Sequence, residues 1–230
     1  MGKIKRGVSL YSYQQAQFFK ELDLEGQIRE VGTNLFGADG IELLDEQALR
    51  KYPNPPEEFF TQWHGWMEKY HTTPVTMDVF CDVLQFRNHV MSYHECADRL
   101  KSDIRLAKKL GFKNVRVLAT TEIEILTEAL PVAEEYDIRI GKEIHAPIPL
   151  NGQFVNEIAD YVERTGTKHL GIVPDWGIFA FRPSEVTLDW YRRQGAKRES
   201  CELVTQLCMD NYNGKSTELN DIDLSLYSAG

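Results

Sequence analysis

The sequence predicts an α/β fold in which the strands of one parallel sheet alternate with helices. Short apolar runs and longer amphipathic runs follow one another from the N-terminus to about residue 214. The predicted strands begin about 25–40 residues apart, a spacing that fits successive βα units. Strands that are joined through helices pair in parallel, because a tight turn cannot connect them.

Three apolar runs in the first part of the chain predict strands, at residues 5–13, 37–45 and 72–82. Helices are expected between them, at residues 14–32 and 56–70. The second helix follows the proline-rich turn "YPNPPEEF". Proline suits the first turn of a helix, so this turn indicates where the helix begins.

The rest of the chain continues the same alternation. Strands are expected at residues 112–120, within the stretch 137–150, and at 168–177. Helices are expected at residues 93–111, 121–136 and 152–166, followed by a largely helical segment at 182–214. Gly111 ends the first of these helices, in keeping with the frequent use of glycine as a C-terminal stop.

Two arrangements of these units compete, a (β/α)8 barrel of the TIM type and an open doubly wound sheet. A doubly wound dinucleotide-binding domain has a glycine-rich turn after its first strand, and the segment "LYSYQQAQ" contains no glycine. A full barrel needs about 250 residues, whereas the sixth strand ends near residue 177. We therefore expect one domain over residues 1–230, an incomplete barrel of about six βα units, with residues 215–230 as an irregular tail.

Charge and composition exclude several classes of protein. The net charge is -9 and the pI is about 5.2, which argues against a protein built to hold nucleic acid or an anionic membrane. No apolar run approaches the roughly 20 residues that span a bilayer, and the basic start has no apolar segment behind it. The four cysteines lack CxxC spacing. We expect reduced thiols in a cytoplasmic protein.

Polar side chains stand at the predicted carboxyl ends of strands five and six. Glu143 and His145 lie two positions apart in "DIRIGKEIHAPIPL", so both point to the same face of a strand. Asp175 follows the apolar run "LGIVP". Neighbouring strands lie about 4.8 Å apart, so the two carboxylates are expected to approach each other. Such a pair repels unless a cation or a shared proton relieves it, and oxygen ligands with an imidazole suit Mn²⁺ or Mg²⁺.

The segment "GKEIHAPI", followed by "GIVPDWGIFAFRP", resembles the xylose-isomerase-like, sugar phosphate isomerase/epimerase superfamily of TIM barrels. The resemblance implies a divalent metal held by Glu, Asp, His and Glu from the ends of strands five to eight. Glu143 matches the first ligand and Asp175 the second. The third and fourth ligands have no counterpart in this sequence, so a four-ligand site cannot form from this chain alone.

Within the superfamily, "DWGIFAFRP" and "YPNPPEEFF" are most similar to the α (catalytic) subunit of C-glycoside deglycosidases. That resemblance implies a metal-dependent lyase, with Mn²⁺ expected, that cleaves the carbon–carbon bond of 3-oxo C-glycosides beside a small β subunit. It implies His145 as the general acid/base. Two alternatives stay open: a keto-sugar or sugar phosphate isomerase, epimerase or dehydratase on the same scaffold, and a non-catalytic chain that depends on a partner.

Five further residues are candidates for substrate contact, each with a structural alternative. Glu42 and Asp78 stand near the ends of strands two and three, where a buried salt bridge is an equal possibility. Arg116 lies inside strand four, where charge pairing within the barrel is the better prediction. Trp176 and Phe179 either stack on a flat aglycone or line a subunit interface. Six strands leave two unpaired sheet edges, so we also expect homo-oligomers or a partner chain.

Overall fold

The computed structural model describes residues 4–81, 83–146 and 148–215. Contacts divide the chain into two compact units, Met1–Asp175 and Trp176–Gly230, and each is described by itself. The single domain over residues 1–230 stays a prediction. Most of the expected tail lies outside the described residues, because these end at Lys215.

The first unit is built on one six-stranded sheet, in which each strand pairs in parallel with the next along the chain. The prediction of an α/β fold with about six βα units is therefore confirmed. The strands are β1 (Gly7–Ser9), β2 (Gly40–Leu44), β3 (Thr73–Val79), β4 (Asn114–Val117), β5 (Arg139–Ile144) and β6 (Leu170–Pro174).

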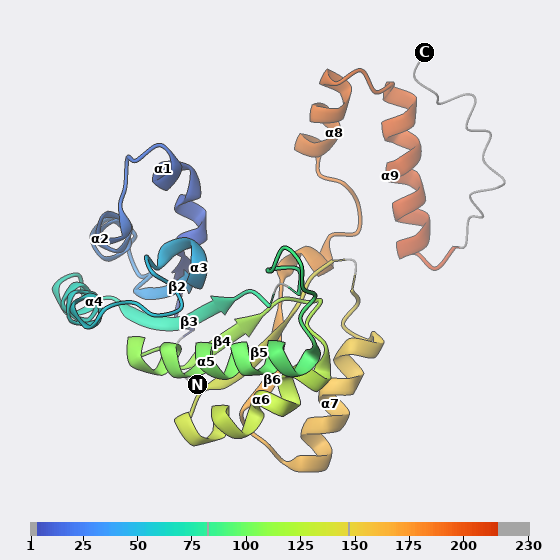
Figure 1. Ribbon diagram of the computed structural model, residues 1–230. Helices are drawn as coiled ribbons and strands as arrows, with labels where there is room; N and C mark the ends of the chain where they lie inside the picture. The colour runs from blue at the N-terminus through green and yellow to red at the C-terminus, as the bar shows by residue number, and fades with distance from the viewer. Residues whose placement is uncertain (1–3, 82, 147, 216–230) are drawn as a thin grey trace. The chain divides into compact units, whose positions relative to one another are not determined.

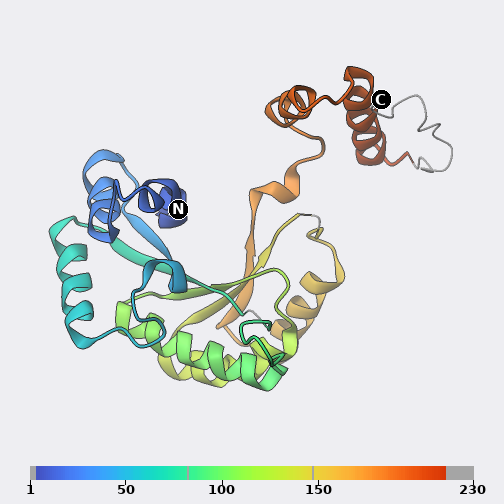
Figure 2. The same ribbon diagram turned by 45° about the horizontal axis from the view of Figure 1, so that its top comes forward.

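Helices cover the outer, convex face of this curved sheet, as Figure 2 shows for α4 to α7. Apolar side chains of the sheet and of these helices form the core between the two layers, with Trp63 and Phe112 in ring contact. The helices of the first unit are α1 (Gln14–Phe18), α2 (Leu24–Asn34), α3 (Asp45–Ala48), α4 (Glu57–Lys69), α5 (Tyr93–Leu110), α6 (Ile123–Tyr136) and α7 (Gln153–Thr165) (Figure 1).

The ends of α5 follow from the local sequence. Ser92 and Glu95 form a capping box, in which each side chain pairs with the backbone N–H of the other residue. Gly111 follows the helix with φ of 84°, a left-handed conformation that costs glycine little. The predicted helix 93–111 is confirmed, as is the opening of α4 behind Pro56.

Two predicted elements near the N-terminus are wrong in extent. The strand expected at residues 5–13 ends at Ser9, and a 3-10 helix, η1 (Leu10–Tyr13), replaces the rest. The helix expected at residues 14–32 is two helices, α1 and α2. Asp23 divides them, because its side chain accepts a hydrogen bond from Gly26 N–H at 2.8 Å and thereby starts a new helix.

The second unit contains a 3-10 helix, η2 (Trp176–Phe179), and two helices, α8 (Glu185–Arg193) and α9 (Arg198–Tyr212). The largely helical segment expected at residues 182–214 is broken near Gly195, which has φ of 99°. Of the described apolar side chains in this unit, only Leu188 and Cys201 are buried. The unit therefore exposes much apolar surface.

Three further findings concern the described residues. Cys81, Cys96, Cys201 and Cys208 are all free thiols, as expected. None of the helices in the described segments is both long and apolar enough to cross a membrane. Strands β1 and β6 are the outermost strands of the described sheet, and Ile172 and Val173 on β6 are more than one-third exposed.

Candidate functional site

The inner face of the sheet carries a cluster of charged side chains at its carboxyl end. Arg116 on β4 donates two hydrogen bonds to Asp78 on β3, from Nε to Oδ1 and from Nη2 to Oδ2, each at 2.7 Å. Its Nη1 donates to Oε1 of Glu143 on β5 at 2.6 Å. The carboxylate of Glu42 on β2 lies 3.7 Å from Nη2. One guanidinium thus contacts three carboxylates from three other strands.

Strand register explains why these side chains meet. Asp78 pairs with Arg116 across β3 and β4, and Arg116 pairs with Gly141 across β4 and β5. Side chains alternate between faces along a strand, so Glu143, two residues beyond Gly141, shares the inner face with Arg116. Gly141 has no side chain in register with Arg116, and a Cβ there would lie 2.6 Å from Cγ2 of Val173.

The cluster is buried and carries excess negative charge. Asp78 is 3% exposed and Glu143 8% exposed. Burial raises the pKa of Asp78 to about 7, against the lowering effect of its hydrogen bonds from Arg116. Those same hydrogen bonds raise the pKa of Arg116, which therefore stays charged. With all carboxylates ionised, three negative charges face one positive charge.

His145 and Asp175 directly follow the last residues of β5 and β6, respectively. Glu143 pairs with Val173, and Asp175 lies two residues after Val173, just beyond the end of β6. The backbone N–H of Asp175 donates to the carbonyl oxygen of Ile144 at 2.9 Å, which keeps the two chain segments adjacent. The imidazole of His145 is exposed, and its Nδ1 lies 2.7 Å from the carbonyl oxygen of Ala146.

Trp176 and Phe179 belong to the second unit. Their rings form an edge-to-face pair with centroids 6.0 Å apart, and Trp176 is 86% exposed. Of the residues predicted for the site, the structure therefore joins Glu42, Asp78, Arg116 and Glu143 in direct contact.

The inner face offers donor types that a divalent cation accepts, although within the described residues no three of its His, Asp and Glu side chains bring ligand atoms within 4.8 Å of one another. The hydrogen bond described for the Glu143 carboxylate ends on Oε1, and within the described residues Oε2 accepts none. Carboxylate oxygens with one imidazole nearby are a donor set that suits Mn²⁺, Mg²⁺ or Zn²⁺. The residual negative charge of the cluster favours a cation as well.

A second buried polar cluster was not foreseen from the sequence. Tyr52 donates its hydroxyl hydrogen to Asp103 Oδ1 at 2.5 Å and accepts a hydrogen bond from Arg99 Nε at 2.9 Å. Burial raises the pKa of Asp103 to about 7 and that of the nearby Asp45 to about 6. Asp45 Oδ2 is a fully buried oxygen that finds no hydrogen-bond partner among the described residues. No motif links these four residues, so only the tertiary fold reveals them.

A third group with metal-ligand chemistry lies on the outer surface. His94, Asp98 and Glu128 each offer a ligand atom within 4.8 Å of the others. The i, i+4 spacing of His94 and Asp98 on α5 was the available signal. The two carboxylates contact different ring nitrogens, and Lys101 Nζ lies 2.8 Å and 2.9 Å from them. This is the geometry of an exposed ion-pair network.

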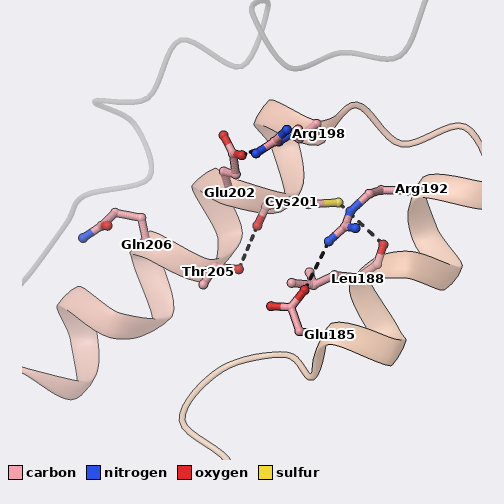
Figure 3. Close-up of a pocket in the computed structure, with 8 residues that line it drawn as sticks. All are labelled: Glu185, Leu188, Arg192, Arg198, Cys201, Glu202, Thr205 and Gln206. Atoms are coloured by element: carbon pink, nitrogen blue, oxygen red, sulfur yellow. Dashed lines mark hydrogen bonds and ion pairs between the residues drawn. The ribbon is translucent and has the colours of Figure 1, made fainter.

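The second unit has its own cavity of about 670 Å³ between α8 and α9 (Figure 3). Its charged side chains are paired with each other, Arg192 with Glu185 and Arg198 with Glu202. Cys201 faces Leu188, with Sγ 4.0 Å from the carbonyl oxygen. Each of the four charged side chains that line this cavity is therefore in an ion pair.

Comparisons with known proteins agree with the geometry of the first unit. The family model described as "Xylose isomerase-like TIM barrel" matches residues 34–184. The "C-glycoside deglycosidase alpha subunit" of Arthrobacter globiformis is 30% identical over 90% of this chain, and the match covers 56% of that protein. The "3'-dehydrocarminate deglycosidase alpha subunit" of a Microbacterium species is 27% identical over 84% of this chain and is covered to 55%.

The chain thus spans about 56% of the length of the first of these relatives. Among solved structures, the IOLI protein with a bound zinc atom superimposes with a TM-score of 0.54 at 16% identity. That match covers 80% of this chain and 68% of the other, and it supports the fold alone. The relatives are enzymes by name. On the family match, its six parallel strands and the polar residues at their carboxyl ends, the chain belongs to the xylose isomerase-like TIM barrel family.

Proposed function

We propose that this chain provides part of the active site of a metal-dependent lyase that cleaves the carbon–carbon bond of 3-oxo C-glycosides. The observation that carries the proposal is the Glu143 carboxylate, which has one oxygen bound by Arg116 and the other without a described partner. Glu143 pairs with Val173 of β6, the strand that Asp175 follows, in a chain whose relatives are named deglycosidase α subunits.

Glu143 and Asp175 are the proposed metal ligands, with Mn²⁺ as the expected ion and Mg²⁺ as the alternative. When bound, a divalent ion supplies charge stabilisation to the keto and hydroxyl oxygens of the sugar. The carboxylates of Glu42 and Asp78 are proposed to bind substrate hydroxyl groups from the neighbouring strands. The guanidinium of Arg116 neutralises one of the three negative charges of the cluster. We propose that this reduces the repulsion among the carboxylates that bind substrate hydroxyl groups.

His145 is the proposed general acid/base, since an imidazole is the side chain that most often serves in this role. The 3-keto group makes the hydrogen on the adjacent carbon C2 acidic. His145 removes that proton, the C–H electron pair forms a double bond between C1 and C2, and the bond from C1 to the aglycone carbon breaks with its electrons on the aglycone. Return of the proton from His145 to the aglycone carbon completes a balanced elimination.

Partners and the aglycone contacts belong to the same proposal. The relatives are named α subunits, which supports a small β subunit as the partner of this chain, with homo-oligomers as a further expectation. We propose that Trp176 and Phe179 stack on a flat aromatic aglycone, because exposed aromatic rings suit such a surface. A full four-ligand metal site would need residues beyond those that match in this chain.

The test supplies a 3-oxo C-glucoside and 3-oxo or phosphorylated free sugars in parallel, with Mn²⁺ present. Released aglycone and rearranged sugar are each measured by chromatography. The proposal predicts release of aglycone from the C-glycoside by the wild-type chain, loss of release in Glu143→Gln and His145→Gln, and retention in the surface control Glu163→Gln. Turnover confined to free sugars would favour an isomerase or epimerase instead, and absence of turnover on every substrate would favour a non-catalytic chain.

A further inference from the structure

Arg116 makes contacts that the proposed reaction does not use directly. We infer that Arg116 is a positioning residue that fixes Glu143 so that Oε2 of this carboxylate is presented to the cation. The inference rests on the proposed function, because it assigns a role to Arg116 at the same metal site. Three observations carry it: the two-point contact with Asp78, the single-point contact with Glu143, and the burial of both carboxylates.

The contact with Asp78 fixes the orientation of the guanidinium. Nε and Nη2 each lie 2.7 Å from a different oxygen of Asp78, so two parallel hydrogen bonds define the plane of the group. The direction of the remaining nitrogen, Nη1, is then set by the strand that carries Asp78. A lysine ammonium has no such plane and cannot reproduce this geometry.

The contact with Glu143 uses one carboxylate oxygen and leaves the other available. Nη1 lies 2.6 Å from Oε1, and within the described residues no hydrogen bond reaches Oε2. Glu143 is 8% exposed, so little space remains for alternative rotamers. Arg116 therefore holds Oε1 and determines which way Oε2 points, as partners of metal-ligating side chains do elsewhere.

The same guanidinium also repels a divalent cation at short range. The positioning of Glu143 by Arg116 increases the affinity for the metal, whereas repulsion by the guanidinium decreases it. If positioning dominates, removal of the guanidinium weakens metal binding. If repulsion dominates, removal strengthens binding, because three carboxylates are then left without their internal counter-charge. The sign of the change distinguishes the two roles.

The experiment measures Mn²⁺ binding to the purified chain, without substrate, by calorimetric titration and by the electron paramagnetic resonance spectrum of the bound ion. The variants are Arg116→Lys, which keeps the charge but cannot make the two parallel hydrogen bonds to Asp78, and Arg116→Met, which loses both the charge and the hydrogen bonds. Arg99→Lys is the matched control, since Arg99 is also largely buried and paired with a tyrosine and an aspartate, but in the second polar cluster. Circular dichroism and thermal unfolding establish that each variant is folded.

We expect both Arg116 variants to bind Mn²⁺ about 10-fold or more weakly than wild type, with a broadened spectrum, and Arg99→Lys to bind as wild type does. Unchanged or tighter binding by the Arg116 variants overturns the inference while leaving the metal site intact. Absence of Mn²⁺ binding by the wild-type chain overturns both the metal site and the inference. Weakened binding in a chain that cleaves no C-glycoside supports the inference and removes only the proposed substrate.

Discussion

Replacement of Asp45 by asparagine is expected to stabilise the protein at neutral and alkaline pH. Asp45 is fully buried, and within the described segments of the chain its Oδ2 has no hydrogen-bond partner. Burial raises its pKa from 3.8 to about 6. Asparagine has the same shape, keeps an oxygen that can accept from Glu46 N–H as Oδ1 now does, and carries no charge to desolvate.

The direction follows from the order of the two pKa values. The folded chain keeps the Asp45 proton at pH values where the unfolded chain has lost it, because the folded pKa is the higher one. The favourable contribution of this proton is therefore complete below about pH 4 and is lost as the pH rises through 6. Asparagine does not titrate and so does not lose this contribution. The free energy of unfolding of the variant therefore increases relative to that of wild type as the pH rises.

The magnitude follows from the size of the pKa change. A rise from 3.8 to about 6, at about 1.4 kcal/mol per pKa unit, amounts to about 3 kcal/mol at pH 8. At pH 5 only about 1.6 kcal/mol of this cost is present, because the folded group is still mostly protonated there. The difference in unfolding free energy between Asp45→Asn and wild type should therefore widen by about 1.4 kcal/mol from pH 5 to pH 8.

Urea unfolding followed by tryptophan fluorescence at pH 5 and pH 8 measures this difference. Asp98→Asn is the matched control, since Asp98 is exposed and the hydrogen bond from Lys101 lowers its pKa. The difference in unfolding free energy between Asp98→Asn and wild type should not increase from pH 5 to pH 8. A difference between Asp45→Asn and wild type that stays constant, or shrinks, between the two pH values would refute the assignment of Asp45 as a buried carboxylate with an uncompensated charge.

Three further predictions concern the first unit. Trp63→Phe should lower the unfolding free energy by about 1–3 kcal/mol, because Trp63 Nε1 donates to the buried carbonyl oxygen of Leu110 at 2.8 Å; an unchanged urea midpoint would contradict this. Ser92→Ala should cost about 1 kcal/mol through loss of the capping box with Glu95, and thermal unfolding with no shift would count against that box. Cys81 should react slowly with a thiol reagent at pH 7, since burial raises the pKa of its thiol to about 12, whereas labelling as fast as that of the unfolded chain would show the burial to be wrong.

The sequence predicts the alternation of strands and helices well, because each buried strand is a short apolar run and several helices carry a recognisable start or stop. Gly111 is such a signal and ends α5 as predicted. Ser92 begins the same helix as its N-cap, a position that serine favours. The division between α1 and α2 was missed because apolar periodicity continues across Asp23, whose role as a cap depends on the local backbone.

The candidate site was predictable in part. Parallel strands place their carboxyl ends at one edge, so spacing alone predicts that Glu143 and Asp175 lie at neighbouring strand ends, and a common site for their carboxylates stays a prediction. The ion pairs of Arg116 with Asp78 and Glu143 required the register of three strands, which no local pattern gives. The burial of Lys142 could not be predicted from local sequence either. This side chain lies on the outer face of the sheet, with Nζ 4.4 Å from the centroid of the Phe154 ring.

The account depends on a cation site formed by Glu143 and Asp175. A crystal of the chain soaked with Mn²⁺, with anomalous diffraction recorded near the manganese edge, locates the ion directly. The account predicts a peak about 2.0–2.2 Å from Oε2 of Glu143 and from a carboxylate oxygen of Asp175. A peak only at His94, Asp98 and Glu128, or no peak on the inner face of the sheet, would contradict it.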